Sequence, residues 1–234
     1  GEYLYKNNNF LFVDIPGTYS IMSNSEEEEI ARDYICFGNP DATVIVVDAT
    51  CLERNLNLVF QIMEITNNII VCVNLLDEAK NKKIEIDLDE LSAQLGVPVV
   101  GTIARKKNTL NNLMDIILKV CKKEIIPKPK KVTYLDIIEK ELNSLNNCLK
   151  AFHTLPHHLY RWISLKIIDG ETNILESIEK NFSVSLIEDT KINHIKTEIT
   201  NVLEDNNISN EKFKDTIVSS IMKHSESICK KVCT

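Results

Sequence analysis

Two short motifs in this chain carry residue types that could bind a nucleotide, and each stands at the end of an apolar run. Residues Asp14–Gly17 read Asp-Ile-Pro-Gly, and residues Asn74–Asp77 read Asn-Leu-Leu-Asp. A carboxylate at a strand end, with glycine three residues later, is typical of switches that hold Mg²⁺ and contact a γ-phosphate. We therefore predict that Asp14 holds Mg²⁺ through a water molecule and that the Gly17 amide faces the γ-phosphate, where glycine permits close backbone approach. The alternative is an ordinary Pro-Gly turn.

The second motif is predicted to recognise guanine. The Asp77 carboxylate would accept from the N1–H and the exocyclic amine of guanine, a donor pattern that adenine lacks, and the Asn74 side chain would tie neighbouring loops together. Leu75 stands where many guanine-binding proteins have lysine, so we expect weaker guanine binding. The alternative is that Asn74 ends a strand and Asp77 caps the helix that follows.

A third segment, Thr102–Ala104, follows the last predicted strand, where a loop that supports the base is expected. There the Ala104 amide would meet the guanine carbonyl, and Ile103 stands where serine is common. This loop is the least distinctive of the three. The residues that we expect to line the nucleotide site are Asp14, Ile15, Pro16, Gly17, Asn74, Leu75, Leu76, Asp77, Thr102, Ile103 and Ala104.

The phosphate-cradling pattern Gly-x-x-x-x-Gly-Lys-Ser/Thr does not occur in the sequence. Thr18 stands where some switches place a glutamine that orients the attacking water, so hydrolysis must be slow or use another group. The chain begins with Gly1 rather than Met and opens on strand-like sequence. We therefore expect a fragment of a longer protein that does not hydrolyse a nucleotide by itself.

Composition limits the class of protein. The chain has 234 residues, 44% of them hydrophobic, which is enough for a sizeable core in one large or two modest domains. A net charge of −7 argues against nucleic acid as a partner. No apolar run approaches the ~18–20 residues that span a bilayer, so we expect these residues to be soluble. Seven scattered cysteines without Cys-x-x-Cys favour a reducing cytosol.

The first half alternates apolar runs with amphipathic stretches, which predicts βαβ units around a mostly parallel sheet. Because ligands bind at the carboxyl ends of such strands, Asp14, Asp48, Asn74 and Thr102 should converge. Tyr3–Tyr5 is predicted as an edge strand. Strands buried on both faces are predicted at Phe10–Val13, Ala42–Val47, Ile69–Val73 and Val97–Val100. Helices are predicted near Glu26–Phe37, Arg54–Thr66, Leu88–Leu95 and Leu110–Cys121.

Strand patterns stop after Ile126–Lys131, a segment with two prolines and three lysines that reads as a linker. We predict an α/β domain at residues 1–123, a linker at 124–131 and an all-α domain at 132–234. Helices are predicted at Tyr134–Leu149, Pro156–Ile168, Ile174–Asn181, Thr190–Asn206 and Ser209–Lys231, with breaks at Gly170, near Asn181–Ser183 and at Asn206–Asn207.

Together these segments resemble the cytosolic part of the ferrous-iron transport protein B (FeoB) family. Asp14–Ser20 is similar to the family's switch motif, and Ser25–Tyr34 resembles its switch II helix. Val47–Leu58, reading Val-Asp-Ala-Thr-Cys-Leu-Glu-Arg-Asn-Leu-Asn-Leu, is the most specific match. Asn74–Ala79 fits the guanine motif, including an apolar residue in place of lysine, and Arg161–Glu171 resembles a helix of the helical half.

The resemblance implies a P-loop-GTPase-like G domain whose first strand is missing from the sequence, followed by a helical domain that tunes nucleotide release. It implies GTP or GDP with Mg²⁺ as ligands, and K⁺ acting through a P-loop and switch I of the complete protein. It also implies a downstream transmembrane domain that passes Fe²⁺, at the cytoplasmic face of the bacterial inner membrane, and it leaves a homo-oligomer open. Slow GTP hydrolysis would be coupled to iron uptake.

Two other classes of protein stay open from the sequence. A degenerate or split gene would give a non-catalytic regulatory or adaptor module that binds a partner but no nucleotide. A ribosome-associated GTPase with a similar G domain is the other, although the helical, non-basic second half argues against it.

Overall fold

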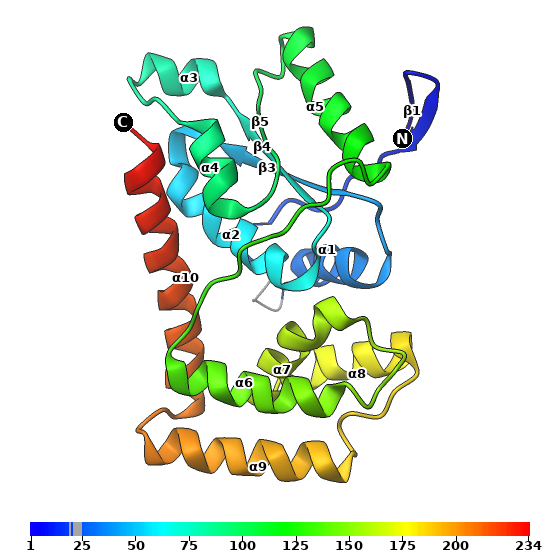
Figure 1. Ribbon diagram of the computed structural model, residues 1–234, viewed down its shortest axis with the longest axis vertical. Coiled ribbons are helices and arrows are strands. Elements are labelled where there is room, and N and C mark those ends of the chain that lie inside the picture. Colours follow the sequence, from blue (N-terminus) through cyan, green and yellow to red (C-terminus); the bar gives the residue numbers. More distant parts are fainter. Residues whose placement is uncertain (19, 21–24) are drawn as a thin grey trace. The chain divides into compact units, whose positions relative to one another are not determined.

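The computed structural model describes residues 1–18, 20 and 25–234, so Tyr19 of the first motif region lies outside it (Figure 1). By its internal contacts the chain forms two compact units, residues 1–130 with 225–234, and residues 131–224. The domain bounds 1–123, 124–131 and 132–234 stay a prediction.

The first unit contains a parallel sheet in the order β3 (Thr43–Asp48), β4 (Ile69–Asn74) and β5 (Val99–Gly101). Residues Ile69–Val73 of the central strand are at most 3% exposed. Figure 1 shows α5 (Lys107–Cys121) on one side of this sheet and α2 (Leu52–Ile65) and α4 (Leu88–Leu95) on the other. Since parallel neighbours need a crossover connection, a helix between successive strands follows from the topology. The predicted parallel α/β architecture is confirmed.

Helix boundaries in this unit follow local capping chemistry. Helix α1 (Glu26–Phe37) begins after Ser25, whose side chain caps the helix by accepting from the Glu28 amide. Helix α4 ends at Gly96, where φ is +72° and an added Cβ would lie 2.2 Å from the Lys128 carbonyl oxygen. Glycine is therefore required at this turn. The short helix α3 (Leu76–Asn81) is not among the predicted helices.

The prediction that Phe10–Val13 is buried on both faces is wrong. Strand β2 (Asn8–Leu11) pairs antiparallel with β1 (Glu2–Tyr5) in a separate two-stranded sheet. Only one face of this hairpin is covered, because Tyr5 and Phe10 pack against a cluster formed by β4, β5 and α5. Leu11, Phe12 and Val13 are therefore 73%, 39% and 45% exposed.

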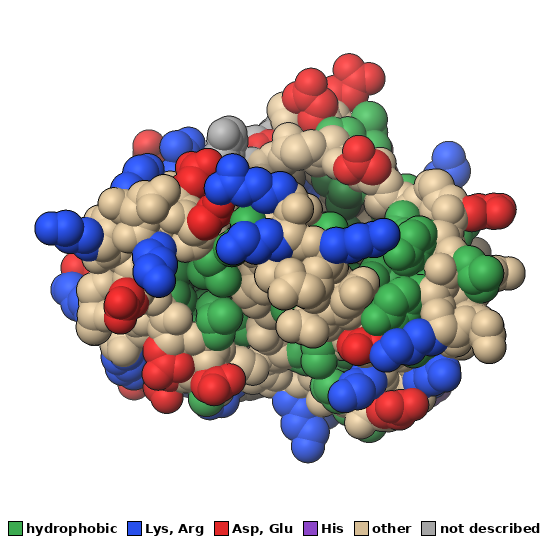
Figure 2. All heavy atoms as spheres, turned by 90° about the horizontal axis from the view of Figure 1, so that it is seen from above, with side chains coloured by type: hydrophobic (Ala, Val, Ile, Leu, Met, Phe, Trp, Pro, Cys, Tyr) green, Lys and Arg blue, Asp and Glu red, His purple; other side chains and the backbone are tan. Residues whose placement is uncertain are grey.

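The prediction of two buried faces is also wrong for Ala42–Val47. Strand β3 lies at the edge of its sheet, and Val46 is 60% exposed although Ile45 and Val47 are buried. Ile45 and Val47 fill one face of the strand, whereas on the other face Val44 packs against the cluster that includes Ile70 and only Val46 is open. On the side of the molecule shown in Figure 2, hydrophobic side chains lie among charged side chains of both signs.

The second unit is helical in every regular element that the structure describes between residues 131 and 224, as predicted. A 3₁₀ turn at His157–Leu159 opens the segment that was predicted as one helix from Pro156. The predicted breaks coincide with positive φ at Gly170, Ser183 and Asn207. The helices are α6 (Asp136–Leu149), α7 (Tyr160–Asp169), α8 (Thr172–Phe182), α9 (Thr190–Asp205) and α10 (Asn210–Val232), the last of which continues into residues 225–234. Every helix in the described part of the chain is too short or too polar to traverse a bilayer.

An ion pair between Arg161 and Glu139 joins the start of the second unit to α6 and α7. Arg161 Nη1 and Nη2 donate to the two Glu139 carboxylate oxygens at 2.6 and 2.8 Å, and Nη2 also donates to the Val132 carbonyl at 2.9 Å. The Tyr134 amide donates to Glu139 at 2.8 Å, and the guanidinium lies 5.0 Å from the Tyr134 ring. Burial raises the pKa of Glu139, but the bonds from Arg161 and Tyr134 lower it further, below its usual value.

Glu139→Gln should lower the free energy of unfolding by about 1–3 kcal/mol near neutral pH, because it removes a charge-assisted pair from a mostly covered site. The folded-state pKa lies below the unfolded value of about 4.3. The stabilisation is thus complete above that value and is lost as the pH falls through the folded pKa. Urea unfolding followed by fluorescence of Trp162, the single tryptophan and 4% exposed, measures both effects.

Glu198→Gln is the matched control. Its carboxylate is 64% exposed and pairs with His194 at 3.5 Å, so its loss should change stability by less than about 0.5 kcal/mol. Equal losses for the two variants, or a Glu139→Gln deficit that persists undiminished to pH 3, would contradict the role given to the Arg161–Glu139 pair.

Candidate functional site

The carboxyl edge of the parallel sheet brings three of the predicted residues together. Asp48 is in register with Asn74 across β3 and β4, and Val73 is in register with Gly101 across β4 and β5. Thr102 follows Gly101 directly, so its backbone amide donates to the Val73 carbonyl at 2.7 Å. The strand ends of the sheet therefore present Asp48, Asn74 and Thr102 side by side, which is where ligands bind in folds of this kind.

Asn74 lies at the centre of this edge. Its Oδ1 accepts from the Thr102 hydroxyl at 3.1 Å and from the Ala104 amide at 3.2 Å. Thr102 is 1% exposed, and its hydroxyl also lies 3.2 Å from the Cys72 thiol. One amide oxygen thus fixes the loop after β5 to the end of β4, and the Ala104 amide proposed for a base carbonyl is held by Asn74.

The turn into α3 sets the direction of the second motif. Leu75 has φ of +63°, a left-handed conformation that side chains rarely adopt, and α3 begins at the next residue. At Gly101 an added Cβ would lie 2.5 Å from Leu76 Cδ1 and 2.6 Å from Leu88 Cδ1. With Leu76 and Leu88 in their present positions, only glycine fits at the end of β5. The sequence pattern did not indicate this requirement.

Asp77, in the first turn of α3, forms an ion pair with Arg105. The Asp77 side chain is 20% exposed and that of Arg105 is 77% exposed. Burial raises the pKa of Asp77, but the hydrogen bond and charge of Arg105, with the amides of Asp77 and Glu78, lower it below its usual range. Asp77 is therefore ionised at neutral pH and acts as an acceptor only. Sequence reasoning missed Arg105, for which the only signal was its position directly after the predicted loop.

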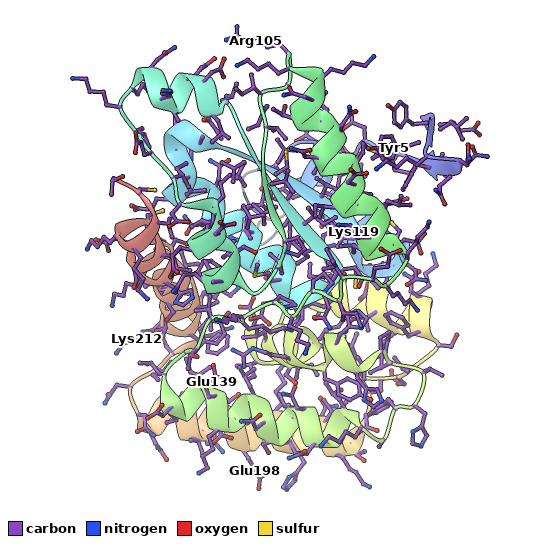
Figure 3. The ribbon with its side chains drawn as sticks, turned by 45° about the horizontal axis from the view of Figure 1, so that its top comes forward. Tyr5, Arg105, Lys119, Glu139, Glu198 and Lys212 are labelled. Carbon is purple, nitrogen blue, oxygen red and sulfur yellow. The ribbon has the colours of Figure 1, made fainter. Side chains whose placement is uncertain are left out.

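The segment between Ala104 and α5 is closed by Thr109. Its hydroxyl accepts from the Ile103 amide at 3.1 Å and lies 2.8 Å from the Lys106 carbonyl. The Lys106 amide donates to the Ile103 carbonyl at 2.7 Å. Figure 3 shows Arg105 next to the N-terminal end of α5, where this turn delivers it.

The loop after β3 is built on the segment that resembles the FeoB family most specifically. Asp48 accepts from the Thr50 amide at 2.7 Å, and Asn55 accepts from the Asp48 amide at 3.1 Å. Burial raises the pKa of Asp48, but the bonds from Thr50 and Cys51 and the charge of Lys82 lower it overall. Asn55 also donates to the Cys51 carbonyl at 3.0 Å. Asn55 was missed as a site-shaping residue.

The first motif lies in an irregular segment after β2. Asp14 and Gly17 are exposed, and nothing lies within 4 Å of a Cβ added at Gly17. Among the described contacts none joins Asp14 to the sheet edge, so its convergence with Asp48 and Asn74 stays a prediction. The Thr18 hydroxyl donates to Glu28 of α1 at 3.1 Å, which links the segment to the predicted switch II helix.

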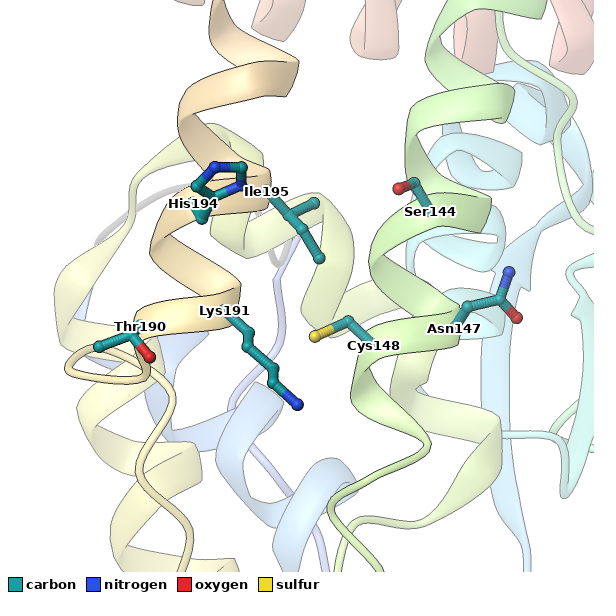
Figure 4. Close-up of a pocket in the computed structure, with 7 residues that line it drawn as sticks. All are labelled: Ser144, Asn147, Cys148, Thr190, Lys191, His194 and Ile195. Atoms are coloured by element: carbon teal, nitrogen blue, oxygen red, sulfur yellow. The ribbon is translucent and has the colours of Figure 1, made fainter.

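Within the second unit, α6 and α9 border an open groove of about 560 Å³ (Figure 4). Burial and Asp189 raise the pKa of Cys148 at its wall, and Lys191 opposes them. The groove-lining residues are Ser144, Asn147, Cys148, Thr190, Lys191, His194 and Ile195. No group of three or more potential metal ligands of the His, Cys, Asp and Glu types occurs among the residues that the structure describes.

The parallel sheet, its loops after β4 and β5, and the helical unit define the class of protein: a G-domain-type α/β fold followed by a helical domain. Residues 1–117 match the family model described as ferrous iron transport protein B, and residues 134–234 match the one described as the FeoB cytosolic helical domain. The chain belongs to the ferrous iron transport protein B family.

Individual relatives agree with this assignment. The Fe(2+) transport protein A/Fe(2+) transporter FeoB fusion protein of Porphyromonas gingivalis is 34% identical over 162 residues, which are 68% of this chain and 19% of that protein. The Fe(2+) transporter FeoB of Escherichia coli is 33% identical over 175 residues, 73% of this chain and 22% of that protein. The chain thus spans about a fifth of the length of these relatives.

Solved structures resemble the whole chain. The cytosolic domain of the T. maritima FeoB iron transporter in GDP form II has a TM-score of 0.78 and 25% identity, covering 100% of this chain and 84% of that one. The same domain in its GMPPNP form gives the same TM-score, identity and coverage.

Asn74→Ala should free the loop after β5, because the Ala104 amide and the Thr102 hydroxyl lose their shared acceptor. We expect a loss of about 1–3 kcal/mol in stability and faster hydrogen exchange at the Ala104 amide, measured by NMR. Asn112→Ala, at an exposed position of α5, is the control and should change neither quantity. Unchanged exchange at Ala104 in Asn74→Ala would show that Asn74 does not hold this loop.

Proposed function

We propose that this chain is the guanine-nucleotide-binding region of a ferrous-iron transporter, in which nucleotide binding and slow GTP hydrolysis are coupled to uptake of Fe²⁺. The observation that carries the proposal is the arrangement of Asn74 and Asp77 beside the Thr102–Ala104 loop at the carboxyl edge of the parallel sheet. GDP and GMPPNP are named for the T. maritima cytosolic domain, which supports a guanine nucleotide as the ligand here.

The proposed roles at the base follow from the acceptors and donors at the sheet edge. Asp77 is ionised, so its two oxygens would accept the N1–H and exocyclic amine of guanine. Asn74 positions the Ala104 amide. When guanine binds, this amide would donate to the base carbonyl, either in place of Asn74 or in addition to it. Leu75 and Leu76 offer aliphatic contact but no charge, so base recognition rests mainly on Asp77.

Asp14 and the backbone of Ile15–Gly17 are proposed for the phosphate side. Asp14 is an exposed carboxylate, and Mg²⁺ is usually held by one or two carboxylates together with phosphates and water. A single carboxylate fits an ion that arrives with the nucleotide. Mg²⁺ would neutralise phosphate charge, while Asp14 orients its water shell. No residue of this chain is proposed for K⁺.

For the whole transporter we propose the roles that the family implies. The helical unit would tune release of the nucleotide, and a membrane domain downstream would carry Fe²⁺ at the cytoplasmic face of the bacterial inner membrane. Fe²⁺ is the transported substrate, and no residue of this chain is proposed as its ligand. A homo-oligomer is compatible with this arrangement.

Binding of a fluorescent GTP analogue with Mg²⁺ tests the proposal directly. We expect weak or no binding by the 234-residue chain and clear binding by the same chain extended at its N-terminus with a phosphate-binding Gly-x-x-x-x-Gly-Lys-Ser/Thr segment, because phosphate contacts supply most of the affinity. A fluorescent ATP analogue is the control and should bind neither form. Failure of both forms to bind the GTP analogue would remove the basis of the proposal and favour an adaptor module.

Asp77→Asn in the form that binds should shift the preference from guanine towards xanthine. The amide presents a donor where the carboxylate presents only acceptors, and xanthine has a carbonyl where guanine has its exocyclic amine. We expect at least tenfold weaker GDP binding and tighter binding of xanthosine diphosphate, measured by displacement of a fluorescent analogue. Asp89→Asn, at an exposed position of α4, should bind like the unaltered protein. An unchanged preference in Asp77→Asn would exclude Asp77 as the base-reading residue.

A further inference from the structure

We propose that Arg105 is an internal competitor for the base site: its guanidinium occupies the Asp77 carboxylate when no base is bound and is displaced when guanine enters. This inference rests on the proposed function, since it assigns a regulatory residue to the same carboxylate. It adds a device by which the chain lowers its own affinity for guanine nucleotides and favours their release.

The geometry places the competitor at the entrance of the site. Arg105 donates from Nη2 to Asp77 Oδ2. The Arg105 side chain is 77% exposed and the Asp77 side chain is 20% exposed, so Arg105 is the more solvent-exposed partner of the pair. A base approaching from solvent would meet Arg105 before Asp77.

The loop keeps Arg105 within reach of Asp77. The preceding residue, Ala104, donates its amide to Asn74, and the Ile103–Thr109 hydrogen bonds close the turn that follows. The Arg105 backbone therefore stands beside α3, while its long side chain remains free to leave the carboxylate. The fold itself thus keeps Arg105 near Asp77, so little further conformational entropy is lost when the ion pair forms.

The donors and acceptors explain why the two partners compete. Guanine would use both carboxylate oxygens, one for N1–H and one for the exocyclic amine, and Arg105 already takes Oδ2. Arginine stays protonated at any physiological pH, so the pair persists wherever Asp77 is ionised. An exposed ion pair is weak and is screened by salt, so the base can displace it.

Arg105→Gln tests the inference in the form of the protein that binds nucleotide. We expect GDP to bind about twofold to fivefold more tightly than to the unaltered protein, which is the range an exposed ion pair can contribute. The gain should shrink as NaCl is raised from about 50 to 500 mM, because salt weakens the competing pair. Titration with a fluorescent GDP analogue and with unlabelled GDP measures both.

Lys106→Gln is the matched control. It removes the same charge one residue away, and no ion pair is recorded for Lys106 in the described part of the chain. It should leave GDP affinity within about 1.5-fold of the unaltered protein at every salt concentration. If Lys106→Gln increased GDP affinity as much as Arg105→Gln does, the effect would come from net charge alone, and the proposed role of Arg105 as a competitor would be overturned.

A double variant separates competition from other effects of Arg105. In Asp77→Asn, the partner of Arg105 has lost its charge, so adding Arg105→Gln should leave xanthosine diphosphate affinity unchanged. If the unaltered protein binds GDP and Arg105→Gln binds it with equal or weaker affinity, this inference is overturned while the proposed function stands. Absence of guanine-nucleotide binding by every variant would overturn the proposed function, and this inference with it.

Discussion

Pairing of β4 with a neighbour on each side is the constraint on which the candidate site depends. The backbone register fixes Asp48 opposite Asn74 and Val73 opposite Gly101. Successive side chains of a strand point to opposite faces of the sheet. A slip of one residue would therefore place the polar Asn74 side chain on the face where the buried Val73 side chain now lies. Complete burial of Ile69, Ile70 and Val71 makes such a slip costly. The hydrophobic strand thereby determines where the polar residues at its end lie.

Two kinds of interaction hold the loops that follow these strands, and they differ in strength. The Thr102 hydroxyl is buried, so breaking its bond to Asn74 leaves a buried donor unsatisfied, whereas the bond from the Ala104 amide to Asn74 is exposed. The pair between Asp77 and Arg105 is open to water and contributes little stability. The scaffold of the site is therefore firm, while the carboxylate that would read the base is held by a contact that is easily exchanged.

Sequence reasoning predicted the elements of this fold where one physical signal dominated. Helices were predicted near Glu26–Phe37 and Leu88–Leu95 from their amphipathic pattern, and the structure has these bounds, with Ser25 and Asp87 as the capping residues. It failed for Phe10–Val13, because an apolar run does not reveal whether one face or two will be covered. The parallel sheet edge followed from strand order, but the Arg105–Asp77 pair could not be predicted. Side chains 28 positions apart meet only through a turn set by Thr109 and by the left-handed Leu75.

An exchangeable contact on a firm scaffold has a consequence for how such a site responds to its ligand. A ligand shifts an equilibrium only by the difference in its affinity for the two states, here Asp77 paired with Arg105 and Asp77 released from it. Because the pair is weak, a small difference in affinity is enough to displace Arg105. The loop backbone does not have to unfold for this, because the bonds that Asn74 makes to Thr102 and that Thr109 makes to Ile103 do not involve Arg105. Exchange at the proposed base site would then proceed by movement of one side chain, on the fast timescale of exposed rotamers rather than that of local unfolding. Strengthening the pair by burial would slow this step, since a buried ion pair is far harder to break.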